Sequence, residues 1–103
     1  MRFREQLYIG EGIKTQKVDK LIKKLRSKPE SAKVFVITIA GNPKDQLDIL
    51  DSTELKKHYY ITYPPYIVGI ANDKSDAFAL IERIVNDCLL SRGDCRLKEY
   101  LLC

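Results

Sequence analysis

Three lysines that closely follow glycine-containing apolar runs are the residues of this chain best suited to bind a ligand. The runs are Ile9-Gly10-Glu11-Gly12-Ile13-Lys14, Ile39-Ala40-Gly41-Asn42-Pro43-Lys44 and Gly69-Ile70-Ala71-Asn72-Asp73-Lys74. If the runs are parallel strands, their carboxyl ends meet at one edge of a sheet, where open α/β folds bind ligands. We therefore expect an anion site there for a phosphate, nucleotide or small acid, formed by Gly12, Lys14, Thr15, Asn42, Lys44, Lys74 and Ser75.

The glycine pattern does not by itself name a ligand. Gly10-Glu11-Gly12 matches neither the dinucleotide-binding fingerprint nor a phosphate-binding loop. Glu11 and Asp73 would also repel an anion. The alternative interpretation is that these are solvated turn residues.

Tyrosines around Pro64-Pro65 form the second candidate surface. A tyrosine suits a protein interface because its ring offers contact area and its hydroxyl a polar tip. The C-terminal leucines add an uncharged apolar segment. We expect contact with a protein partner or a second copy of the chain through Tyr59, Tyr60, Tyr63, Tyr66, Leu101 and Leu102. The alternative is that the tyrosines only pack beneath the strand that follows them.

The first helical segment is strongly basic. Seven lysines and arginines lie between Lys14 and Lys28, against one acid, Asp19. Phosphate backbones bind such surfaces through counterion release. The segment has no aromatic residue to stack on a base, and the chain has no RNA-binding or helix-turn-helix motif. The sequence therefore argues against a nucleic-acid partner and favours a solvated helix.

Residues suited to catalysis or metal binding are scarce. His58 is the single histidine, and the sequence places no partner side chain beside it. Cys88, Cys95 and Cys103 lack the Cys-x-x-Cys spacing of metal and redox sites. We expect no catalytic residue, no metal site and no cofactor, and we expect the thiols to be reduced.

Length and composition favour a single domain over residues 1–103. Apolar residues make up 45% of the chain and charged residues 31%, with a net charge of +4, which is typical of a globular protein. The N-terminus lacks the apolar core of a secretory signal. The uncharged stretches fall short of the roughly 18 residues that a membrane span requires. We expect a cytoplasmic protein without membrane contact.

The apolar periodicity predicts the elements that position these residues. Short runs rich in β-branched and aromatic residues predict strands at 6–10, 33–40 and 66–71. Helical periodicity predicts helices at 15–27 and 76–91, the second ending at Gly93, with short helices after 54 and 94. The expected buried stripe of the long helix is Phe78, Ile81, Val85 and Cys88, broadened by Ala77, Ile84 and Leu89.

The segment 47–50 decides whether the sheet has a fourth strand. Leu47-Asp48-Ile49 alternates as an edge strand does, whereas Leu47 and Leu50 are also spaced for a helix. We expect a short antiparallel strand. The element order β-α-β-(β)-α-β-α then favours a small α/β sandwich with a three-stranded, mostly parallel sheet and a fourth, antiparallel edge strand.

Parts of the chain resemble an uncharacterised family of small bacterial proteins. The resemblance lies in Tyr63-Pro64-Pro65-Tyr66-Ile67-Val68-Gly69-Ile70-Ala71, in Ser75-Asp76-Ala77 and in Asp45-Gln46-Leu47-Asp48-Ile49. It implies a bacterial cytoplasmic protein and no particular activity.

The leading functional prediction is a small non-enzymatic domain that acts by binding another protein or itself. The alternatives are a small anionic ligand at the sheet edge and weak nucleic-acid binding through the first helix.

Overall fold

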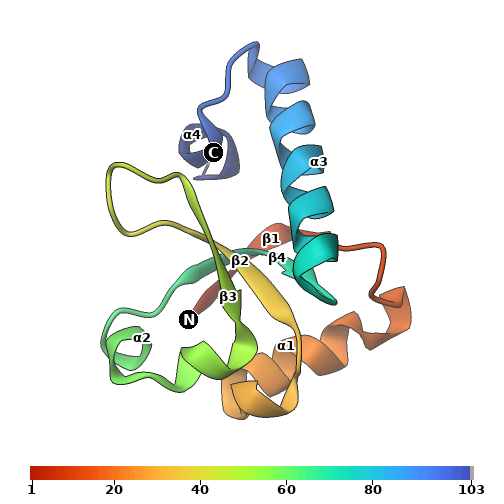
Figure 1. The fold of residues 1–103 in the computed structure, drawn as a ribbon, viewed down its shortest axis with the longest axis vertical. Helices are drawn as coiled ribbons and strands as arrows, with labels where there is room; N and C mark the ends of the chain where they lie inside the picture. The colour runs from red at the N-terminus through yellow and green to blue at the C-terminus, as the bar shows by residue number, and fades with distance from the viewer. Residues whose placement is uncertain (103) are drawn as a thin grey trace.

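A mixed β-sheet between two layers of helices forms the structure, a computed structural model that describes residues 1–102 (Figure 1). The strands are β1 (Arg2–Ile9), β2 (Phe35–Ile39), β3 (Leu47–Asp51) and β4 (Tyr66–Ala71). The helices are α1 (Val18–Ser27), α2 (His58–Thr62), α3 (Lys74–Arg92) and α4 (Leu97–Leu102). Short 3-10 turns occupy Thr15–Lys17, Pro29–Ser31 and Ser52–Lys56.

Two of the three strand pairs are antiparallel. The strand order is β1-β4-β2-β3, in which β1 is parallel to β4. β2 runs antiparallel to both of its neighbours. The expected three-stranded, mostly parallel sheet is therefore wrong, whereas the expected antiparallel edge strand is confirmed as β3.

The direction of β2 accounts for this difference. Lys33 and Val34, which lead into β2, line the same groove as Gly12 and Asn72, which follow β1 and β4. β2 thus begins at the edge where the other two strands end. Its apolar run could not reveal this, because a strand covered on both faces has the same sequence pattern in either direction.

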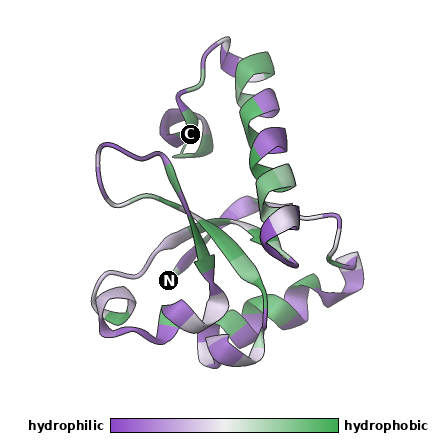
Figure 2. Cartoon of the chain, in the orientation of Figure 1, coloured by the Kyte–Doolittle hydropathy of each residue, from purple (hydrophilic) through white to green (hydrophobic). Residues whose placement is uncertain are grey.

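Each face of the sheet is covered by its own helices. α3 and α4 pack on the face that carries Ile37 and Val68. α1 and the turns around α2 pack on the face that carries Val36 and Ile67. Successive residues of a strand point to opposite faces, so β2 has apolar residues at consecutive positions. Figure 2 shows largely hydrophobic strands β2 and β3, and both hydrophobic and hydrophilic residues along α1 and α3.

The long helix α3 buries part of the expected stripe: Ala77, Ile84 and Cys88 are buried as expected, but Leu80 is buried in place of Phe78. Phe78 is 59% exposed instead. Because α3 is apolar on more than one side, periodicity alone does not determine which side packs on the sheet. The helix ends at Gly93 in the left-handed region, as the sequence predicts.

Within residues 1–102, no helix combines the length and the apolar character needed to cross a membrane. Cys103 lies outside the described residues.

Candidate functional site

The expected anion site is divided between two edges of the sheet. β1 and β4 end at one edge, and Gly12, Lys14, Thr15, Lys74 and Ser75 follow them there. β2 ends at the opposite edge, so Asn42 and Lys44, which follow β2, lie there instead. The seven residues therefore do not converge, because their convergence required all three strands to be parallel.

Asn42 has a structural role in the turn after β2. Its side-chain oxygen accepts hydrogen bonds from the backbone amides of Lys44 at 3.0 Å and Asp45 at 2.8 Å. Its backbone carbonyl accepts one from Lys98 Nζ at 2.9 Å, which ties the turn to α4. The amide side chain is thus already used to close the turn.

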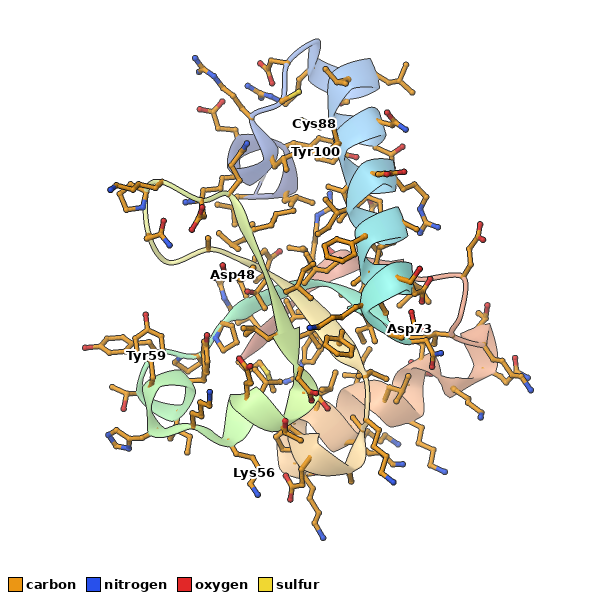
Figure 3. The ribbon with its side chains drawn as sticks, in the orientation of Figure 1. Asp48, Lys56, Tyr59, Asp73, Cys88 and Tyr100 are labelled. Atoms are coloured by element: carbon orange, nitrogen blue, oxygen red, sulfur yellow. The ribbon has the colours of Figure 1, made fainter. Side chains whose placement is uncertain are left out.

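A carboxylate of the chain itself occupies the edge where β1 and β4 end. Asp76, in the first turn of α3, accepts hydrogen bonds from the backbone amides of Asn72 at 2.9 Å and Gly12 at 3.2 Å. A Cβ at Gly10 would lie 2.2 Å from Asp76 Oδ2, so only glycine leaves room for this carboxylate. Asp73, at the start of α3 in Figure 3, accepts a hydrogen bond from the Asp76 amide. Three backbone amides of this edge, those of Gly12, Asn72 and Asp76, are therefore already bonded to carboxylates of the chain.

Of the two predicted lysines at this edge, Lys14 borders a groove beside α1, whereas Lys74 does not line it. The groove has a volume of about 360 Å³, and Ile13, Leu21 and Val34 contribute apolar surface to it. We call it the lysine groove, after its five lysines, Lys14, Lys17, Lys20, Lys24 and Lys33. Within residues 1–102 none of these ammonium groups forms an ion pair or donates a hydrogen bond.

The four clustered tyrosines border a second groove, at the opposite edge of the sheet. Its volume is about 440 Å³, and Pro64 and Pro65 also line it. We call it the tyrosine groove; its rings are those of Tyr59, Tyr60, Tyr63 and Tyr66. Three of the rings pack together, with centroids 5.1 Å apart for Tyr59 and Tyr60 and 5.4 Å apart for Tyr59 and Tyr63. Arg2 stacks on the ring of Tyr66 at 5.1 Å.

Asp48 is the acidic residue of the tyrosine groove, and the sequence did not indicate it as a site residue. It belongs to β3, opposite Thr38 of β2, and is half-buried. Within the part of the chain that the structure describes, its carboxylate has no hydrogen bond or ion pair. The pKa of Tyr60 is raised, first by burial and then by the negative charges of Asp48 and Glu54. Figure 3 shows Asp48 on the β2–β3 hairpin and Tyr59 on α2.

The two C-terminal leucines have different environments. Leu101 is buried in the core beneath α3, so it does not belong to an exposed surface. Leu102 is 56% exposed. The last helix therefore docks onto its own chain through Leu97 and Leu101.

The remaining candidates are isolated from one another. His58 is exposed on α2, where its Nε2 lies 3.4 Å from the Thr62 hydroxyl. Cys88 is buried, and burial raises the pKa of its thiol, whereas Cys95 is exposed. Among residues 1–102, no three histidine, cysteine or acidic side chains are grouped so that they could hold a metal ion.

Comparisons with protein-family models, curated proteins and solved structures find no match to this chain, and the resemblance to a family of small bacterial proteins stays a prediction.

Proposed function

We propose that this protein is a binding domain that holds a segment of another protein in the tyrosine groove. The observation that carries the proposal is the combination of exposed apolar side chains with an unpaired carboxylate in one groove. In the tyrosine groove Tyr59 is 58% and Tyr63 65% exposed, and Ile61, which lines an adjacent groove, is also 65% exposed. Neighbouring apolar side chains that stay exposed on a small protein often mark an interaction surface.

A second groove extends the surface available to a partner. Its volume is about 520 Å³, and it runs beside the C-terminal end of α1, where Leu25 and Arg26 line it. Tyr60, Pro64 and Pro65 line both this groove and the tyrosine groove. The two grooves are therefore adjacent, and together they suit an extended peptide better than a compact small molecule.

The charge of the groove indicates the chemistry of the partner. The carboxylate of Asp48 is half-buried without a cationic partner, which is costly unless a ligand supplies one. Tyrosine faces also attract lysine and arginine side chains. We therefore propose a partner segment that carries a basic side chain and places it beside Asp48.

Selection of random peptides displayed on phage tests this proposal against the purified protein. We expect the enriched peptides to contain arginine or lysine. The Tyr59→Ser, Tyr63→Ser double variant should lose at least ten-fold in enrichment, because it removes two contact rings. Asp48→Asn should shift the enriched peptides from basic to neutral.

Phe78→Ser is the matched control, because Phe78 on α3 is as exposed as Tyr59 but lies outside the groove. It should leave the enrichment unchanged. Peptides that bind the double tyrosine variant as well as the wild type would contradict the proposal. Sedimentation velocity of the same proteins distinguishes self-association, since a dimer lost in the double variant identifies a second copy as the occupant.

A further inference from the structure

We infer that the lysine groove binds the phosphate backbone of a single-stranded nucleic acid. This inference is independent of the tyrosine groove, because the two grooves share no residue. The sequence argued against nucleic acid because the first helix has no aromatic residue for base stacking. A groove that binds through phosphates does not need one.

The spacing of the lysines matches a ligand with several regularly placed charges. Lys17, Lys20 and Lys24 are three and four residues apart, so they lie on one side of the helical segment and form one wall. At 1.5 Å of rise per residue, this row spans about 10 Å. Lys14 extends the row toward the end of β1. A single phosphate could contact only part of such a row.

Lys33 adds positive charge from a different segment of the chain. It precedes β2 and lines the groove with its neighbours Ala32 and Val34. Its φ of 53° lies in the left-handed region, which residues other than glycine rarely adopt. Its neighbours Ala32 and Val34 are both buried. The groove is therefore lined by ammonium groups from more than one segment.

No acidic residue lines the groove, and no described carboxylate neutralises its lysines. Five uncompensated charges in a concave surface attract an anionic chain and release the counterions bound to it. A phosphodiester chain carries one charge on every unit, which suits a row of lysines. A flat anionic membrane cannot follow a concave surface as well as a flexible strand can.

The apolar lining of the groove determines what else the ligand contacts. Ile13, Leu21 and Val34 can pack against sugars and base edges, but no ring lines the groove. Other proteins that bind single strands without sequence preference combine a basic groove with aromatic side chains on which the bases stack. Binding here should therefore be electrostatic and nearly independent of base sequence.

Fluorescence anisotropy with a labelled twelve-nucleotide poly-dT strand tests the inference. Each phosphate neutralised in a single strand contributes about 0.7 to the slope of log K against log salt. Five lysines then predict a slope near −3.5, so that affinity falls about a hundred-fold between 50 and 200 mM salt.

Two double variants with the same change in charge test the location. Lys20→Ala with Lys24→Ala removes two lysines of the groove, and the slope should become shallower by about 1.4. Lys23→Ala with Lys28→Ala removes two exposed lysines of the same region that do not line the groove, and the slope should not change. Circular dichroism verifies that both variants are folded.

Three outcomes would overturn the inference. The first is no binding of the strand at 50 mM salt. The second is an equal loss in the two double variants, which would show a diffuse charge effect. The third is equal affinity for poly-glutamate or for anionic vesicles of matched charge, which would assign the surface to an acidic protein or a membrane.

Discussion

At the scale of single residues, the two kinds of basic side chain have separate roles. All six arginines take part in contacts within the fold, such as those of Arg26 over Phe3 at 4.9 Å and Arg83 with the Ile9 carbonyl at 2.9 Å. The five lysines of the lysine groove form no such contact within residues 1–102. Planar guanidinium groups suit stacking and carbonyl contacts, whereas ammonium groups stay hydrated and mobile. The free positive charge of the protein is therefore carried mainly by lysine.

The close approach of Gly10 to Asp76 predicts strong coupling between these two positions. Gly10→Ala should displace the Asp76 carboxylate, which costs the hydrogen bonds to Gly12 and Asn72. We expect a loss of about 2 kcal/mol in the free energy of unfolding for Gly10→Ala and a similar loss for Asp76→Ala. Urea unfolding of both single variants and of the double variant measures the coupling.

The double variant should lose at least about 1 kcal/mol less than the sum of the single variants, because the clash disappears with the carboxylate. Strictly additive losses would mean that the alanine at position 10 disturbs something other than Asp76.

Substitution of lysine by glycine should have opposite effects on stability at Lys33 and at Lys23. Lys33→Gly relieves the left-handed strain, so the free energy of unfolding should rise by about 0.5–1 kcal/mol. Lys23→Gly, inside α1, should lower it by about 1 kcal/mol because glycine is a poor helix former. Thermal and urea unfolding compare the two variants, and destabilisation by Lys33→Gly would mean that the backbone at position 33 is not strained.

At the scale of elements, the sequence predicts what each segment is better than how it is placed. The alternation Leu47-Asp48-Ile49 correctly indicates an edge strand, and the helical periodicity over 15–27 correctly indicates the segment that contains α1. The residues of β2 do not determine its direction. The direction depends on the edge of the sheet at which the turn after α1 places the start of β2. The expected anion site failed for this reason.

The candidate grooves were predictable to different degrees. Four tyrosines close in sequence around two prolines indicate their groove directly, because a short segment cannot separate them widely. Asp48 and Lys33 reach their grooves only through strand pairing and the turn before β2, which are long-range features. The signals that could have indicated them are the alternation in β3 and the lysine immediately before the buried run of β2.

The orientation of α3 predicts a contrast between two leucines of the same helix. Leu80 is 2% exposed and Leu90 is 87% exposed. Leu80→Ala should lower the free energy of unfolding by about 2–5 kcal/mol, because it leaves a cavity beneath the helix. Leu90→Ala should change it by no more than about 0.5 kcal/mol. Urea unfolding measures both, and a loss at Leu80 as small as that at Leu90 would mean that α3 packs on the sheet through another side.

At the scale of the whole molecule, the sheet separates the two proposed binding surfaces. The lysine groove lies at the edge where β1 and β4 end, and the tyrosine groove at the edge where β2 ends and β4 begins. The antiparallel β2 that divides the expected anion site also creates this arrangement. A strand bound in the lysine groove would therefore not obstruct a peptide confined to the tyrosine groove.

A hydrogen-bonded group of three side chains joins distant parts of the chain. Tyr8 of β1 donates a hydrogen bond to Asp87 of α3 at 2.8 Å, and its hydroxyl lies 2.8 Å from that of Tyr100 of α4. Burial, followed by these two hydrogen bonds, raises the pKa of Tyr8 far above its ordinary value. Figure 3 shows Tyr100 at the level where α4 faces α3.

The hydrogen-bonded tyrosine Tyr8 should make the stability of the fold decrease at alkaline pH. Unfolded Tyr8 releases its proton near pH 10, whereas folded Tyr8 keeps it, so rising pH favours the unfolded state. The contribution of Tyr8 to stability is therefore complete below about pH 10 and decreases above it, by at most about 1.4 kcal/mol per pH unit. Tyr8→Phe should lower the free energy of unfolding by about 1–2 kcal/mol at pH 8, because Asp87 loses a donor.

Urea unfolding between pH 8 and pH 11 measures both proteins against Tyr63→Phe, an exposed tyrosine that serves as the control. The curves of the wild type and Tyr8→Phe should converge as the pH rises, because the phenylalanine variant has no hydroxyl to ionise at that position. A residual alkaline decrease in the variant is expected from Tyr60, whose pKa is also raised. Parallel curves would show that Tyr8 ionises alike in both states, and the link between β1, α3 and α4 would then have to rest on packing alone.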